Sequence, residues 1–303
     1  MSEGIVPGLD ELVALRRAAT GRRPPRRGRH GMSGQAPSPM RGRGMEYAES
    51  REYTQGDDAR HIDWRLTART GKPHTKLFQA ERERLTLIVA DTAPALYFGT
   101  RVRFKSVQAA RAGAVAAWAA VRDGDRLAAL RGSVREPPVI PASGVRGALR
   151  VLDAMVRWYT RPPEEDGGLG VALDHADRLL RPGSRLVVLA DAASVLAQAP
   201  SRWPTLAQHR EVIVLLLCDP IERDPPRANL PFRVERPATS TASTRIELDL
   251  AGSVQRARWQ AAFSAPIAEA MKTLARSGIR TRALSTDMPS ESWLDLFQGT
   301  RAA

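Results

Sequence analysis

Two short apolar segments, each closed by an aspartate, constrain the fold more than any other feature of the chain. They read LTLIVAD over residues 85–91 and RLVVLAD over residues 185–191. An unbroken apolar run of this length, rich in branched residues, is typical of a strand that is buried on both faces in a parallel sheet. The segment EVIVLLL over residues 211–217 predicts a third strand of the same kind.

The segments between these strands have the periodicity of helices, as residues 104–121 illustrate with apolar side chains at helical spacing. Further helices are predicted over residues 144–159, 170–180, 192–199, 204–209 and 253–277 and near residue 293. Further strands are predicted over residues 126–130, 245–250 and 281–286, with an edge strand over 134–140 and irregular chain over 219–240. Strands that alternate with helices indicate an α/β fold, in which a mostly parallel sheet has helices on both faces.

The first 84 residues depart from this pattern and predict an irregular N-terminal extension. Residues 1–44 combine a short helix that begins near Gly8 with a flexible arm rich in Gly, Pro and Arg. Residues 45–84 have few apolar anchors, so we expect this segment to pack on the core rather than to fold alone. Residues 85–298 then form the α/β domain.

Positive charge is concentrated at the front of the chain. The formal net charge is +13, and residues 1–44 hold nine arginines against three acidic residues. One interpretation is that the arm over residues 16–43 binds nucleic acid, non-specifically because it has no Phe, Tyr or Trp to stack on bases. The other interpretation is a solvated basic tail.

Composition and motifs exclude several classes of protein. No apolar run approaches the roughly 20 residues of a membrane-spanning helix. The first residues lack the pattern of a secretory signal and Cys218 is the only cysteine, so we expect a cytoplasmic protein. The sequence has no phosphate-binding loop and no nucleophile elbow, and its five histidines are scattered. We therefore expect a non-catalytic protein without a cofactor.

The densest cluster of charged residues lies in YTQGDDARHIDWRLTAR, residues 53–69. Gly56, Asp57 and Asp58 predict a turn in which carboxylates accept hydrogen bonds from backbone N–H groups. The charged residues that follow are of both signs within ten positions: Arg60, Asp63, Arg65 and Arg69. Two interpretations remain open, a network of internal ion pairs or a docking surface for a partner protein. The candidate partner-binding residues are Asp57, Asp58, Arg60, Asp63, Trp64 and Arg69.

The same segment resembles the hallmark of bacterial domain-of-unknown-function family 58, a von Willebrand factor A-like group. The hallmark is G-D-D-x-R-x-I-D-W with A-R a few residues on, matched here by Gly56 to Trp64 followed by Ala68 and Arg69. The stretch VADTAPALYFGTRVRFKSVQAARA and the later Cys218-Asp219-Pro220 are also similar to the family. The resemblance covers about residues 8–298.

The resemblance implies a Rossmann-like von Willebrand factor A-type domain, usually non-enzymatic and often encoded beside a MoxR-type AAA+ ATPase. It also implies a divalent cation held by a D-x-S-x-S loop, a later threonine and a later aspartate. Here the loop reads Asp91-Thr92-Ala93-Pro94-Ala95, and Gly167-Gly168-Leu169 lacks the threonine.

Asp91 and Asp191 are the acids that remain of such a site. Two carboxylates without supporting hydroxyls make a poor Mg²⁺ site, so we expect no functional metal. The two acids are instead expected to cap the helices that follow their strands. A hydrolase built on Asp91, Asp191 and a bound ion is one alternative, which the missing serines of the loop disfavour.

Two other functions are considered beside the hydrolase. The leading hypothesis is a non-catalytic interaction module, an adapter or co-chaperone of a MoxR-type AAA+ ATPase, that docks through residues 53–69. The alternative is non-specific nucleic-acid binding through the Arg-rich arm.

Overall fold

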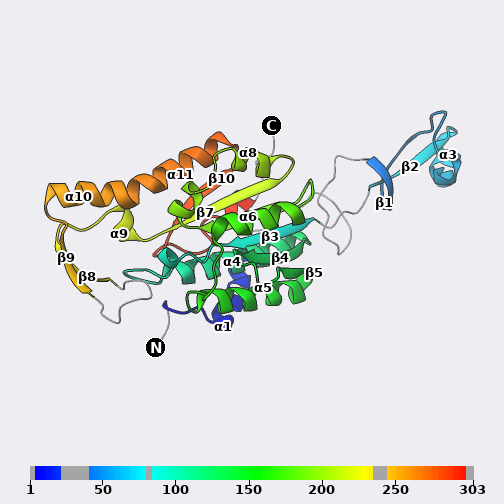
Figure 1. Cartoon of the computed structure of the whole chain (residues 1–303). Helices are drawn as coiled ribbons and strands as arrows, with labels where there is room; N and C mark the ends of the chain where they lie inside the picture. Colours follow the sequence, from blue (N-terminus) through cyan, green and yellow to red (C-terminus); the bar gives the residue numbers. More distant parts are fainter. Residues whose placement is uncertain (1–3, 22–40, 80–83, 235–243, 298–303) are drawn as a thin grey trace. The chain divides into compact units, whose positions relative to one another are not determined.

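The computed structural model describes residues 4–21, 41–79, 84–234 and 244–297 (Figure 1). The chain divides into two compact units. The sheet unit comprises Met1–Gly28 and Leu85–Ala303, and the signature unit comprises Arg29–Arg84. Most of the Arg-rich arm, residues 22–40, lies outside the described residues, so its role stays a prediction. The packing of residues 45–84 on the core also stays a prediction.

A six-stranded sheet forms the centre of the sheet unit. Its strands are β3 (Leu85–Ala90), β4 (Arg126–Arg131), β5 (Val139–Ser143), β6 (Arg185–Ala190), β7 (Glu211–Cys218) and β10 (Arg280–Ser285). Their spatial order is β10-β7-β6-β3-β4-β5, and all neighbours are parallel except β5, which pairs antiparallel with β4 at the edge. The predicted α/β class with a mostly parallel sheet is confirmed.

Alternate residues of the strands face two separate apolar cores. On β3, Ile88 and Ala90 belong to the first core, whereas Leu87 and Val89 belong to the second. The first core is covered by α1 (Leu9–Ala14), α2 (Arg16–Thr20), α4 (Lys105–Asp123) and α5 (Gly144–Tyr159). The second is covered by α6 (Gly168–Leu179), α7 (Ala192–Leu196), α8 (Arg202–Ala207) and α11 (Ala265–Arg276).

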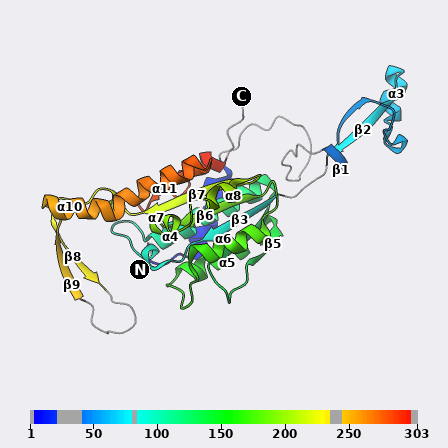
Figure 2. The same ribbon diagram turned by 45° about the horizontal axis from the view of Figure 1, so that its top comes forward.

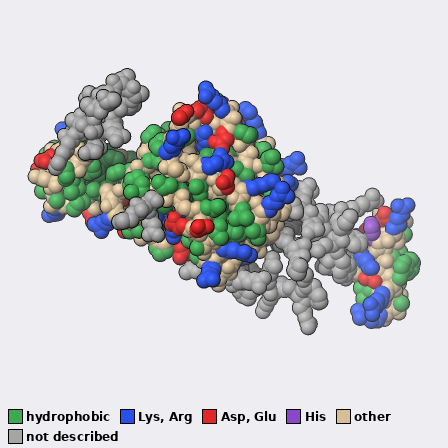
Figure 3. All heavy atoms as spheres, turned by 90° about the horizontal axis from the view of Figure 1, so that it is seen from below, with side chains coloured by type: hydrophobic (Ala, Val, Ile, Leu, Met, Phe, Trp, Pro, Cys, Tyr) green, Lys and Arg blue, Asp and Glu red, His purple; other side chains and the backbone are tan. Residues whose placement is uncertain are grey.

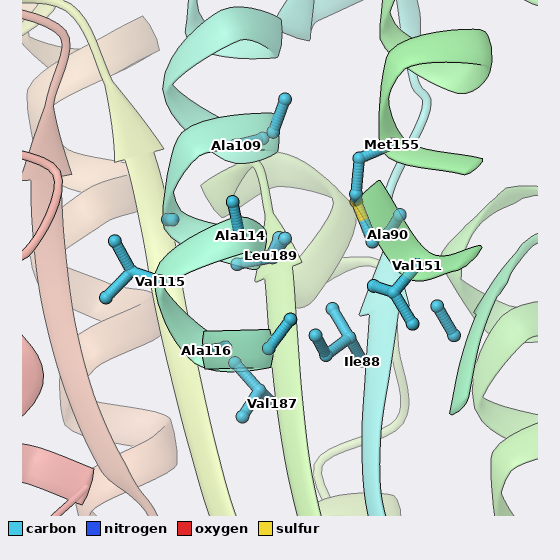
Figure 4. Packing of buried hydrophobic residues seen from close by; sticks show 14 of the residues in the cluster. Ile88, Ala90, Ala109, Ala114, Val115, Ala116, Val151, Met155, Val187 and Leu189 are labelled. Atoms are coloured by element: carbon cyan, nitrogen blue, oxygen red, sulfur yellow. The ribbon is translucent and has the colours of Figure 1, made fainter. Parts of the chain in front are cut away.

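Small side chains allow α4 to lie close to the sheet. Figure 4 shows Ala109, Ala114 and Ala116 of this helix near the branched side chains of β3 and β6. Close packing of this kind fills the space under the helix with few voids, so α4 is held along its whole length. The first residues of α4 are thereby fixed next to the ends of the strands.

Two predicted boundaries at the ends of the sheet need correction. The edge strand predicted over residues 134–140 lies instead at β5. Its first half forms a turn because the Ser133 hydroxyl oxygen accepts hydrogen bonds from the backbone N–H groups of Arg135 and Glu136, at 3.1 and 2.8 Å. The closing helix predicted near residue 293 is a single 3-10 turn, Leu294–Phe297.

A two-stranded antiparallel hairpin, β8 (Asn229–Val234) and β9 (Thr244–Asp249), lies beyond the sheet and beside α10 (Ser253–Trp259) (Figure 2). The indole N–H of Trp259 donates to the Ile221 carbonyl oxygen at 2.9 Å, and its ring packs with Phe232 of β8. These contacts make a third, small apolar cluster. They fasten the hairpin to the end of α10.

The hairpin overturns part of the prediction for this region. Residues 219–240, predicted to be irregular, contain α9 (Pro220–Arg223) as well as β8. Pro231 is tolerated in β8 because this strand pairs with a single neighbour. The strand predicted over 245–250 exists as β9, but it pairs with β8 and not with the central sheet.

The signature unit is built on an antiparallel pair of strands, β1 (Arg41–Glu52) and β2 (His74–Gln79). Between them lie a 3-10 turn, Ala59–His61, and α3 (Trp64–Thr70). Gly71 ends α3 in the left-handed conformation with φ 71°, where its N–H donates to the Thr67 carbonyl oxygen.

None of the helices that the described residues form is long and apolar enough to cross a membrane.

Candidate functional site

Two of the acidic residues predicted to bind a partner hold the backbone of the signature segment itself. Asp57 accepts a hydrogen bond from the Thr54 N–H at 3.0 Å, and its Oδ1 lies 2.7 Å from Nη2 of Arg51. These contacts hold the pKa of Asp57 below its ordinary value. Asp58 accepts from the Arg60 N–H at 3.0 Å and begins the 3-10 turn. The predicted turn, with carboxylates bonded to backbone N–H groups, is confirmed.

Asp63 has the same kind of role at the start of α3. Its Oδ1 accepts from the Leu66 N–H at 3.1 Å, and its Oδ2 accepts from the Ser50 hydroxyl at 3.2 Å. Both bonds favour the ionised form and lower the pKa of Asp63. Of the predicted network of ion pairs, the described residues include the pair of Asp57 with Arg51. No ion pair within the described residues involves Arg60, Arg65 or Arg69.

Nine residues of this segment are exposed, and we call the tryptophan and the three arginines among them the Trp64 face: Arg60, Trp64, Arg65 and Arg69. Trp64 begins α3 and is 71% exposed. Arg65 and Arg69 lie four residues apart on the same helix and therefore share one side of it. Figure 3 shows Lys and Arg side chains beside hydrophobic ones on the signature unit. The exposed surface of this segment thus includes a large apolar ring and three positive charges.

At the carboxyl edge of the sheet, the structure brings Asp91 and Asp191 together. The backbone N–H of Asp191 donates to Asp91 Oδ2 at 3.1 Å, and the Ala93 N–H donates to Asp91 Oδ1 at 3.0 Å. Asp191 also caps α7 by accepting from the Ala193 N–H at 2.9 Å. Burial raises the pKa of Asp91, and the neighbouring Asp191 carboxylate adds to the rise. The expected capping role is confirmed for Asp191, while Asp91 holds the loop before a 3-10 turn.

A lysine lies among these acids. Lys105, the first residue of α4, is 1% exposed, and its Nζ lies 2.8 Å from Asp191 Oδ2 and 2.7 Å from Glu222 Oε1. Burial opposes its charge, but the charges of Asp191 and Glu222 outweigh burial and hold the pKa of Lys105 above its ordinary value. Glu222 in turn accepts from the Asp219 N–H, which completes a capping box at α9.

The next strand end continues this polar layer. Asp219 follows β7 and is fully buried; its carboxylate accepts from the Ile221 N–H, from the N–H and hydroxyl of Thr100, and from the Thr286 hydroxyl. Four neighbouring strands, β3, β6, β7 and β10, are thus each followed by a hydrogen-bonded polar residue: Asp91, Asp191, Asp219 and Thr286. The adjacent Cys218 thiol is buried, and burial raises its pKa to about 12.

The edge does not fit the divalent cation that the fold resemblance implies. Both oxygens of Asp91 accept backbone N–H groups, and Asp191 and Glu222 are paired with an ammonium. Within the described part of the chain, no three Asp, Glu, His or Cys side chains are placed so that they could hold a metal ion. Ammonium and N–H donors occupy the carboxylate oxygens that a metal ion would need here.

Sequence reasoning left Arg65 out of the partner-binding residues and gave no site role to Lys105, Asp219, Glu222 and Thr286. Lys105 is one of only four lysines in a chain rich in arginine, which is a weak signal in its favour. The order Asp-Pro-x-Glu over residues 219–222 is a capping-box pattern, which was the available signal for Asp219 and Glu222. Asp57, Asp58 and Asp63 face inward to the backbone, whereas Arg60, Trp64 and Arg69 are exposed.

Comparison with known proteins places these features in a family. Three uncharacterized proteins, one from Mycobacterium bovis and two from strains of Mycobacterium tuberculosis, are each 31% identical over 258 residues, which is 84% of this chain and 77% of the relative. The family described as "Protein of unknown function DUF58" matches residues 49–265, a range that includes the Trp64 face and most of the sheet edge. The chain therefore belongs to the DUF58 family.

Proposed function

We propose that the chain is a non-catalytic protein-interaction module whose docking surface is the Trp64 face. The observation that supports this most strongly is the 71% exposure of Trp64 in a helix of seven residues. Burial of an indole ring is among the most favourable contacts that a side chain can make. Tryptophan and arginine are also the residues that contribute most at protein interfaces. An exposed tryptophan beside arginines is thus better suited to binding than to stabilising its own unit.

Charge indicates the chemistry of the partner. Because no ion pair within the described residues uses Arg60, Arg65 or Arg69, their charges are available to another molecule. The complementary surface carries carboxylates around an apolar pocket for the indole ring. A MoxR-type AAA+ ATPase is the proposed partner, on the strength of the resemblance to proteins that are often encoded beside such ATPases. The adapter role is proposed together with that partner.

The absence of catalysis is supported by the state of the acids at the sheet edge. A catalytic carboxylate must reach a substrate atom, directly or through one water. Asp91, Asp191 and Asp219 instead accept hydrogen bonds from backbone N–H groups of their own or a neighbouring loop. Their bonding capacity is largely used within the fold.

The test is a titration of the full chain with the MoxR-type ATPase of the same genome, by calorimetry and by pull-down with and without nuclease. The test variant combines Trp64→Ala, Arg65→Glu and Arg69→Glu. We expect its Kd to rise about 100-fold or more, because each interface hot spot contributes about 2 kcal/mol. Its melting temperature should stay near that of the wild type, since all three side chains are exposed.

The matched control combines Leu149→Ala, Arg146→Glu and Arg150→Glu on α5, where all three residues are exposed and the arginines are again four apart. We expect this control to bind like the wild type. Equal weakening in both variants would show a general charge effect, and unchanged binding in the Trp64 variant would remove the face from the interface. Capture that disappears with nuclease would favour the nucleic-acid alternative.

A further inference from the structure

The strongest unexplained feature outside the Trp64 face is the buried ammonium of Lys105. Lysine is almost never fully buried unless it is paired. Here the side chain is 1% exposed and lies within 2.8 Å of two carboxylates from different loops. Asp191 follows β6 and Glu222 belongs to α9, which follows β7, while Lys105 begins α4 after the β3 loop. One cation therefore ties together three loops of the sheet edge.

We propose that the ammonium of Lys105 is the resident cation of this edge, in place of the divalent metal ion that the fold resemblance implies. A metal ion there would neutralise carboxylates from several strand ends and fix their loops. The ammonium does both through two short ion pairs, and it is covalently attached, so it cannot be lost by dilution or chelation. This inference concerns the sheet unit and is independent of the proposed docking at the Trp64 face.

The hydrogen bonds and ion pairs at this edge leave few carboxylate oxygens for a metal ion to bind. Asp191 Oδ1 accepts from the Ala193 N–H while its Oδ2 faces the ammonium, and Glu222 is shared between the Asp219 N–H and the ammonium. A divalent ion would need these oxygens at about 2.0–2.6 Å, and it would be repelled by the adjacent positive charge. The buried ammonium is also unable to reach a carboxylate of a partner, so docking through an ion-bridged carboxylate is excluded at this edge.

The test compares the response to metal of the wild type and of Lys105→Ala. Thermal unfolding and calorimetry are run on the full chain in EDTA and then in millimolar Mg²⁺, Ca²⁺ or Mn²⁺. We expect no saturable response in the wild type. We expect Lys105→Ala to melt roughly 6 °C or more lower, because one partner of a buried ion pair has been removed. The freed carboxylates should then bind Mn²⁺, which should raise the melting temperature of this variant by several degrees.

Two further variants test whether the response to Mn²⁺ is specific to the carboxylates around Lys105. Lys272→Ala removes an exposed lysine on α11 and should change neither stability nor metal response. Adding Asp191→Asn to Lys105→Ala should abolish the response to Mn²⁺. The proposal is overturned if the wild type binds a divalent ion in a manner that Asp191→Asn removes, or if Lys105→Ala folds and shows no response.

A second set of variants, in which neutral side chains replace the buried charges, tests the proposal if Lys105→Ala does not fold. Lys105→Met alone leaves two buried carboxylates unpaired, whereas Lys105→Met with Asp191→Asn and Glu222→Gln removes all three charges at similar volume. We expect the triple variant to melt well above Lys105→Met, because replacing a whole buried ion cluster is tolerated far better than breaking it. A triple variant no more stable than Lys105→Met would overturn the proposal.

Discussion

Two buried threonines at the carboxyl edge of the sheet have opposite hydrogen-bonding states. The hydroxyl of Thr286 donates to Asp219 Oδ2 at 2.8 Å. The hydroxyl oxygen of Thr92 has no hydrogen-bond partner among the described residues, although it is equally buried. A buried polar atom without a partner is costly, whereas a satisfied one contributes to stability. The same substitution at the two positions should therefore have opposite effects.

We predict that Thr286→Val lowers the free energy of unfolding by about 1–3 kcal/mol, because it leaves an oxygen of the buried Asp219 short of a donor. Thr92→Val should be neutral or slightly stabilising, because an unpaired hydroxyl is replaced by a methyl group of the same shape. Urea unfolding followed by circular dichroism measures both. Equal losses at the two positions would contradict the hydrogen-bond assignment and point to packing alone.

At the scale of elements, the loop after β4 and the start of α6 approach so closely that only glycine fits. The Gly167 N–H donates to the Gly132 carbonyl oxygen at 2.5 Å. A Cβ on Gly132 would lie 2.1 Å from the carbonyl oxygen of Gly168, which is backbone and cannot move aside as a side chain could. The contact fixes where α6 begins relative to the sheet.

We predict that Gly132→Ala destabilises the sheet unit by about 1–3 kcal/mol, because the loop and the helix must separate. Gly170→Ala is the control inside α6: its new Cβ would meet the end of the flexible Gln198 side chain at 3.3 Å. That substitution should instead stabilise by about 0.5–1 kcal/mol through the helix preference of alanine. Chemical denaturation distinguishes the two, and a harmless Gly132→Ala would refute the close contact.

The sequence predicts some of these elements far better than others. The strands β3, β6 and β7 are unbroken apolar runs, and burial on both faces leaves no other arrangement for them. The hairpin escapes prediction because its prolines hide β8, and because its anchor, Trp259, comes later in the chain. The hydrophobic pattern of one segment cannot indicate its contact with a residue later in the chain.

The candidate site is likewise predictable only where local sequence pattern determines it. Asp91 and Asp191 could be expected to meet, since parallel strands end at one edge of the sheet. Lys105 could not be placed with them, because its partners lie 86 and 117 positions away in the sequence. On the signature segment the hallmark residues were recognisable, but their division between backbone-bonding acids and an exposed Trp64 face required the structure.

At the scale of the whole molecule, an ion-pair cluster fastens the opposite edge of the sheet. The buried Arg185 places its Nε 2.7 Å from Glu211 Oε2, and Arg280 also pairs with Glu211. Burial alone would raise the pKa of Glu211, but the charge of Arg185 and the bonds from both arginines outweigh it and hold the pKa below its ordinary value of 4.5. Three neighbouring strands, β6, β7 and β10, are joined by this carboxylate.

Acid should therefore weaken the sheet unit through Glu211. A folded-state pKa below the unfolded one means that the stabilisation is present above about pH 4.5 and is lost as pH falls through the folded pKa. We predict that Glu211→Gln costs about 1–3 kcal/mol near pH 7 and much less near pH 3. Glu269→Gln, at an exposed position on α11, should cost nothing at either pH. A Glu211→Gln penalty that is independent of pH would disprove the linkage.

The buried Cys218 makes the chain suited to labelling. Thiolates, not thiols, react with maleimide dyes, and the only cysteine is enclosed with a pKa of about 12. The native protein is therefore expected not to react with such reagents while it stays folded. An Ala68→Cys substitution on the exposed side of α3 gives one reactive thiol, and a dye attached there would report association at the Trp64 face in real time.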